Sequence, residues 1–139
     1  MTPENVLDRQ VPRNRKVAEA LQLCGLVERS GQGMNRMFEG SIKQGKPVPD
    51  FSGTDAFQVS VSLRGELQHP GFVRYLEKLG RERVESFSTQ DFLVLDYVHR
   101  SEQVPLALTS RVERLIDLGA IERFGRKQLM ALQGILWVE

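Results

Sequence analysis

The stretch that most constrains the fold runs from Thr109 to Lys127 and reads TSRVERLIDLGAIERFGRK. Apolar residues such as Val112 and Leu115 recur at helical spacing, and Gly119 follows as a residue that often ends a helix in the left-handed conformation. A short apolar segment, a basic turn and another apolar segment come next. This order is typical of the recognition helix and wing of a winged helix-turn-helix.

The residues around this stretch extend the same prediction. We expect Thr109 or Ser110 to cap the helix, and two strands at 120–124 and 128–132 to flank the basic turn. Upstream, Ser88 and Asp91 form the S-x-x-D pattern of a capping box, which opens a helix that is apolar over much of its girth. That helix should lie at the centre of the C-terminal part.

A similar pattern occurs early in the chain, at 17–33, which reads VAEALQLCGLVERSGQG. Asn14 is suited to cap this helix and Gly25 to end it, and Cys24 on its apolar stripe is expected to be a buried thiol. Gly25 aligns with Gly119, and the Glu-Arg pair at 28–29 aligns with the pair at 122–123. Two helices that each end at a glycine and lead into an extended segment often have similar sequences, which explains this similarity. An internal duplication stays the alternative.

The clearest strand pattern lies at 56–63, where apolar and polar residues alternate strictly. Phe57, Val59, Val61 and Leu63 share one face, so a strand with one buried face is expected. A polar stretch with glycine and proline follows at 65–71 and marks a boundary. We predict an α+β protein with a small helix-and-strand domain at 1–66 and, at 67–139, a winged helix preceded by a leading helix.

Composition excludes several classes of function. The formal net charge is +1, so no overall field attracts nucleic acid or membranes, and no apolar run approaches the length of a membrane span. The N-terminus does not resemble a signal peptide, which favours a cytoplasmic protein. A single cysteine permits no intrachain disulfide, and His69 and His99 have no partners at metal-ligand spacing. We expect no enzymatic activity, no metal and no cofactor.

DNA is the partner that the C-terminal pattern favours. Hydroxyl groups and helix N-termini suit phosphate, and arginine suits phosphate or guanine edges. However, residues 81–139 carry eight Lys/Arg and nine Asp/Glu, so this part is not basic overall. A packing or dimerisation module, and hence a homodimer, stays the alternative. The candidate DNA-binding residues are Thr109, Ser110, Arg111, Arg114, Arg123, Arg126 and Lys127.

A second candidate site is the G-x-G formed by Gly31 and Gly33. Glycine-rich turns can cradle phosphate, but no lysine-serine pair follows, and the longer fingerprint of dinucleotide-binding folds is absent. A nucleotide role for these two glycines is therefore a weak alternative.

The first 64 residues resemble a known family, through the pattern PRNxxIAxxLxxLGLIERxGxGIxRI. It is the C-terminal region of bacterial and archaeal proteins described as RecG-like, ATP-dependent DNA helicase-related, or as transcriptional regulators with a Schlafen AlbA-type DNA-binding domain. The matching residues are Pro12, Arg13, Asn14, Ala18, Leu21, Gly25, Leu26, Glu28, Arg29, Gly31, Gly33 and Arg36.

This resemblance implies the tail of an ATPase fold of the gyrase and histidine-kinase type. The parts of that fold that hold magnesium and adenine are missing here, so ATP is not expected to bind, and no helicase P-loop occurs. The resemblance also implies a longer natural protein and favours regulation. We therefore expect a DNA-binding fragment of a transcriptional regulator, with a protein-interaction module or an ATP-binding remnant as alternatives.

Overall fold

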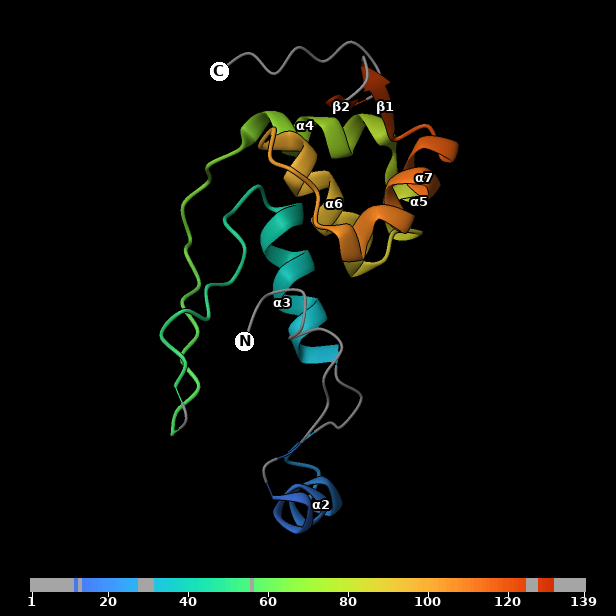
Figure 1. Cartoon of the computed structure of the whole chain (residues 1–139). Helices are drawn as coiled ribbons and strands as arrows, with labels where there is room; N and C mark the ends of the chain where they lie inside the picture. The colour runs from blue at the N-terminus through green and yellow to red at the C-terminus, as the bar shows by residue number, and fades with distance from the viewer. Residues whose placement is uncertain (1–11, 13, 28–31, 56, 125–127, 132–139) are drawn as a thin grey trace.

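The structure is a computed structural model that describes residues 12, 14–27, 32–55, 57–124 and 128–131. These residues form a small α-rich fold with little strand (Figure 1). The elements, in order, are α2 (Arg15–Leu23), α3 (Gln32–Lys43), α4 (Pro70–Leu79), α5 (Arg81–Glu85), α6 (Thr89–His99), the short 3-10 helix η1 (Leu106–Leu108), α7 (Thr109–Asp117), β1 (Ile121–Phe124) and β2 (Gln128–Ala131). The two strands pair antiparallel, with Ile121 opposite Ala131.

The predicted central helix is α6. Phe92 and Val94 are fully buried, and residues 91–96 are buried without interruption, so this helix is covered on all sides. Its N-terminus carries the predicted capping box, in which Ser88 and Asp91 each bond to the other's backbone N–H. From α4, the buried Tyr75 hydroxyl donates a 2.5 Å hydrogen bond to the carbonyl oxygen of Ala120. This bond ties α4 to the start of β1.

Helix α3 belongs to the same core as the C-terminal helices. Phe38 and Ile42 on α3 are buried in one cluster with residues of α4, α6 and α7. The Thr89 hydroxyl donates a 2.6 Å hydrogen bond to Glu39, and the Lys43 ammonium lies 4.7 Å from the centre of the Phe92 ring. Residues on both sides of the predicted boundary at 66 therefore share one core.

The two glycines that were predicted to end helices do so in the left-handed conformation. Gly25 has φ +69° and Gly119 has φ +65°. The N–H of each glycine bonds to the carbonyl three residues earlier, and the next N–H bonds five residues back, to Leu21 and Leu115 respectively. This is the Schellman arrangement, which satisfies carbonyls that the helix end leaves without partners. Asn14 also caps α2 as predicted, by accepting from the N–H of Val17 at 3.1 Å.

The prediction that Cys24 is buried is wrong, because its thiol is exposed. No residue of α2 is buried, and the apolar side chains of Val17 and Leu21 face solvent. Figure 1 shows α2 standing apart from the other helices. The helical spacing of the apolar residues is real, but no described part of the chain packs against the stripe that they form.

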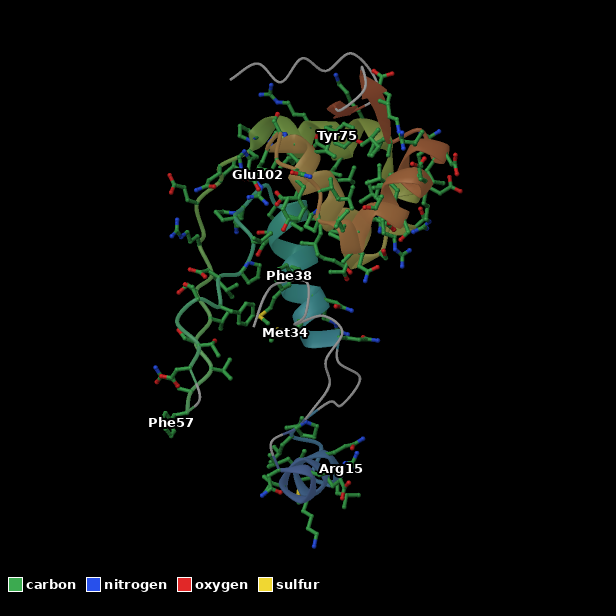
Figure 2. All side chains as sticks on the ribbon, in the orientation of Figure 1. Arg15, Met34, Phe38, Phe57, Tyr75 and Glu102 are labelled. Carbon is green, nitrogen blue, oxygen red and sulfur yellow. The ribbon has the colours of Figure 1, made fainter. Side chains whose placement is uncertain are left out.

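The strand predicted at 56–63 is not part of a β-sheet. Residues 46–55 and 57–67 form a long two-legged excursion, which we call the arm. Its legs are joined by an isolated bridge between Asp50 and Ser62 and by hydrogen bonds between Thr54 and Ser60 and between Asp55 and Gln58. Phe57, at the end of the arm in Figure 2, is 87% exposed, and Val59 is also exposed. The prediction of a buried face is therefore wrong, because alternation favours a strand without supplying the sheet that would cover it.

The base of the arm is fixed to the core. The carbonyl of Gly45 accepts hydrogen bonds from the N–H groups of Gln68 and His69, at 3.0 and 3.1 Å. Farther along, Phe51 is buried and stacks on Phe38 of α3, with ring centroids 6.3 Å apart. The sequence also predicts a short turn or one-turn helix at residues 2–10 and apolar packing at residues 136–138, and both segments lie outside the described residues.

Candidate nucleic-acid interface

Helix α7 follows η1 and begins at Thr109, which is exposed together with Ser110. The prediction that one of these two residues caps the helix is wrong. Leu108 occupies the cap position, and no side chain bonds to the first N–H groups of the helix. The N–H of Thr109 bonds to the carbonyl oxygen of Leu106 in η1, so it is not open to a ligand. The positive end of the α7 dipole is favourable for an anion.

Two of the predicted arginines point toward the N-terminus of α6. Arg111 donates through Nε to the side-chain oxygen of Gln90 at 3.0 Å. Arg114 forms an ion pair with Asp91 and bonds to the carbonyl oxygen of Ser86 at 3.4 Å. These contacts join α7 to α6 and fix the direction of both guanidinium groups.

Asp91 is the unexpected member of this cluster. Its side chain is fully buried, and one carboxylate oxygen, Oδ2, accepts from Arg114 and from the N–H and hydroxyl of Ser88. The other oxygen is buried with no hydrogen-bond partner among the described residues. Because a buried carboxylate needs a partner, part of the charge of Arg114 serves the fold. The sequence indicated Asp91 as a capping residue but gave no signal of this ion pair.

Arg123 on β1 pairs with Glu113 on α7, and both side chains are well exposed. An exposed ion pair contributes only about 0–1 kcal/mol, so a phosphate group could replace the carboxylate at small cost. Between residues 109 and 123 three arginines are balanced by three acidic side chains, which leaves no net charge. Arg126 and Lys127 lie outside the described residues.

The glycine pair is only partly described. Gly31 lies outside the described residues, and Gly33 lies exposed in the first turn of α3. A side-chain carbon added at Gly33 would meet nothing within 4 Å. No close approach to the backbone at this position therefore requires a glycine.

Sequence reasoning missed a shallow groove of about 290 Å³ between α3 and the arm. Its basic side chains are Arg36, Lys46 and Arg64. Arg36 and Lys46 bond to the amide oxygens of Gln32 and Gln44, at 3.4 and 2.6 Å, and neither pairs with a carboxylate of the described residues. Arg64 helps lower the pKa of Asp50, whose main cause of lowering is the hydrogen bonds from Ser52. The return of the arm brings Arg64 here, and no local pattern predicts that.

The two histidines also lie together, with ring centroids 4.6 Å apart and the rings nearly perpendicular. Burial lowers the pKa of His99 to about 4, with smaller contributions from His69 and Arg100. Among the described residues no group of three or more His, Cys, Asp or Glu side chains could hold a metal ion. No helix in the described part is long and apolar enough to cross a membrane.

Residues 1–63 match the family model described as "Putative ATP-dependent DNA helicase recG C-terminal". This match supports a RecG-related, ATPase-like identity for the N-terminal part of the chain. It includes α2, α3 and most of the arm, and it ends before α4. No curated protein and no solved structure matches the chain.

Proposed function

We propose that this chain is the DNA-binding part of a transcriptional regulator, and that it contacts duplex DNA with the start of α7 and the β1–β2 hairpin. The observation that carries the proposal is the arrangement at the start of α7. Thr109 and Ser110 are exposed at the positive end of the α7 dipole, where no side chain caps the helix, and Arg111 and Arg114 are held next to them by α6. A helix start with hydroxyl groups and oriented arginines suits the DNA backbone.

The order α6, η1, α7, β1, β2 supports a winged-helix interpretation, in which the wing is the β1–β2 hairpin. In this proposal η1 stands where a longer middle helix would lie. The regulatory role, and cooperation with an AlbA-type DNA-binding domain, come from the resemblance of the N-terminal residues to regulators of that kind.

The proposal is tested by the salt dependence of binding to a 20-base-pair duplex, measured by fluorescence anisotropy. Each phosphate contact contributes about 0.9 to the slope of log affinity against log salt. The double variant Arg126→Ala, Lys127→Ala should therefore flatten the slope by about 2. The matched control is Arg15→Ala with Lys16→Ala on α2, which removes the same charge from exposed positions. Absent or salt-independent binding, or an equal effect of the control, would refute the proposal.

A second variant tests the ion pair next to the wing. Glu113→Gln frees Arg123 from its carboxylate partner, so DNA affinity at low salt should rise by up to about fivefold, the equivalent of an exposed ion pair. Glu85→Gln breaks the exposed pair with Arg81 on α5 and serves as the control. An equal rise in both variants would indicate only a change in net charge.

A second candidate function is a protein-interaction module, and a specific observation favours it. Several large apolar side chains are exposed on α2 and several more on the arm, whereas α7 buries most of its own apolar face. Exposed apolar side chains that gather on one element commonly mark an interface. In this candidate the contact lies in the RecG-related part and not in the C-terminal hairpin.

A further inference from the structure

The returning leg of the arm, residues 57–63, has one edge that is already hydrogen-bonded. The N–H and C=O groups of Ser62 bond to Asp50 at 2.8 and 3.1 Å. Those of Ser60 bond to the Thr54 hydroxyl at 3.2 and 3.1 Å, and those of Gln58 bond to Asp55. All even-numbered residues of this leg therefore direct their backbone groups inward, to residues 50–55 of the same chain.

The opposite edge is open. In an extended strand successive residues direct their backbone groups to opposite sides, so the odd-numbered residues face outward. In the described part of the chain, the backbone groups of Val59, Val61 and Leu63 have no hydrogen-bond partner. An open edge of this kind is a template for another strand, and proteins usually cover or disrupt it.

We propose that this edge pairs antiparallel with the same edge of a second copy of the chain, around a twofold axis at Ser60. The inference rests on the second candidate function above and names its partner. In this register Val59 faces Val61 of the other copy, and Phe57 faces Leu63. Val59, Val61 and Leu63 have outward-facing backbone groups, so the Val59–Val61 pairs can form both of their hydrogen bonds. The N–H of Phe57 already donates to the Asp55 carboxylate at 2.7 Å, so each Phe57–Leu63 pair can form only the bond from the Leu63 N–H to the Phe57 carbonyl.

The side-chain pattern favours a second copy as the occupant, because it reads the same in both directions from Ser60. Apolar residues lie one and three positions away on each side, and polar residues lie two positions away. Antiparallel self-pairing therefore places the apolar side chains of both copies on one face of the joined sheet. A shift by two residues in one direction would place Phe57 opposite Gly65, and in the other direction it would place Leu63 opposite Asp55. Either shift leaves one apolar residue without an apolar partner.

The arm is also built to present this edge. Its base is closed at Gly45 and anchored by the Phe51–Phe38 stack, so the leg is held out from the core (Figure 2). An isologous contact that pairs like with like closes at two copies and leaves no further edge on these legs. The expected assembly is therefore a dimer and not a filament.

The first test is the mass of the full chain in solution, measured by light scattering after size-exclusion chromatography. The wild-type chain should be a dimer. Val61→Pro removes one outward N–H and should give a monomer with an unchanged melting temperature, because residue 61 is exposed. The control Val61→Thr keeps the N–H and should remain a dimer with weaker association.

The second test uses cross-linking and does not depend on the proline variant. In a Cys24→Ser background, Ser60→Cys should form a disulfide between copies, because facing Cα atoms of such a pair lie about 4.5 Å apart. Ser52→Cys, exposed on the other leg, should not cross-link. A monomeric wild-type chain would refute the interaction function and the inference together. If the chain remains a dimer with Val61→Pro and does not cross-link at Ser60→Cys, pairing through the open edge is refuted, but the interaction function is not.

Discussion

The ends of α2 and α7 are nearly the same in local structure and opposite in surroundings. Both helices end at a glycine with φ between +65° and +69°, and both bond the next N–H to a leucine carbonyl five residues earlier. Leu115 before Gly119 is fully buried, whereas Leu21 before Gly25 is 37% exposed. The same short sequence pattern therefore produces the same helix end whether or not anything packs against it.

The difference shows what the local pattern leaves undecided. After Gly119 the chain enters the core at Ala120 and Ile121, both fully buried, and Tyr75 bonds to the first of them. After Gly25 the chain continues through the exposed Leu26 and Val27. The matching helix ends are explained by the same local hydrogen-bond pattern at a glycine, and they require no internal duplication. A partner surface, and not the helix end, decides whether the apolar stripe is buried.

The largest expected contrast between the two ends is in stability. Leu115→Ala should destabilise the fold by about 2–5 kcal/mol, because it leaves a cavity in the core. Leu21→Ala, at the aligned position, should change the free energy of unfolding by less than about 0.5 kcal/mol. Urea unfolding followed by circular dichroism measures both. Equal losses would mean that α2 is part of the cooperative fold.

The second contrast is in how stability depends on pH. Both histidines of the chain lie in the packed part and none lies on α2, so only the packed part should respond to histidine protonation. The folded-state pKa of His99 is about 4, below its ordinary value of 6.5, so the unfolded chain binds the proton more readily. Stability from this residue is therefore complete above pH 6.5 and falls as the pH is lowered toward 4. Since His99 is half-buried, we expect a loss of no more than about 2 kcal/mol.

Asp96 acts in the opposite direction. Burial raises its pKa despite the Arg100 ion pair, so the folded chain takes up this proton first as the pH falls. The variant His99→Gln removes the contribution of His99 to the pH dependence and leaves that of Asp96. Its unfolding midpoint should change less than that of the wild-type chain between pH 7 and pH 5. An equal fall in both proteins would show that His99 is not responsible.

Local signals predicted much of the secondary structure. The caps at Asn14 and Ser88, the helix ends at Gly25 and Gly119, and the β1–β2 hairpin are all present. Each depends on hydrogen bonds within a few residues, which a short sequence pattern specifies directly.

Contacts between distant residues could not be predicted in the same way. The buried Asp91–Arg114 pair joins residues that are far apart in sequence, and Arg64 reaches the groove only because the arm folds back. The alternation at 57–63 predicts a strand with one buried face, but the structure has no strand at these residues, and their apolar side chains are exposed. Such features depend on which surfaces meet, and periodicity carries no information about that.

The smallest contrast is at the glycines themselves. Ala at 25 or 119 would meet no atom within 4 Å, so each substitution adds only the cost of a left-handed alanine, about 1–2 kcal/mol. Gly119→Ala should lower the global free energy of unfolding by that amount, because its helix end leads into the core. Gly25→Ala should leave the global value unchanged and reduce only the helical signal of α2, since a nine-residue helix without packing is marginal in water. If Gly25→Ala instead lowered the global value equally, α2 would be stabilised by a contact with the rest of the molecule, and its exposed stripe would not be available to a partner.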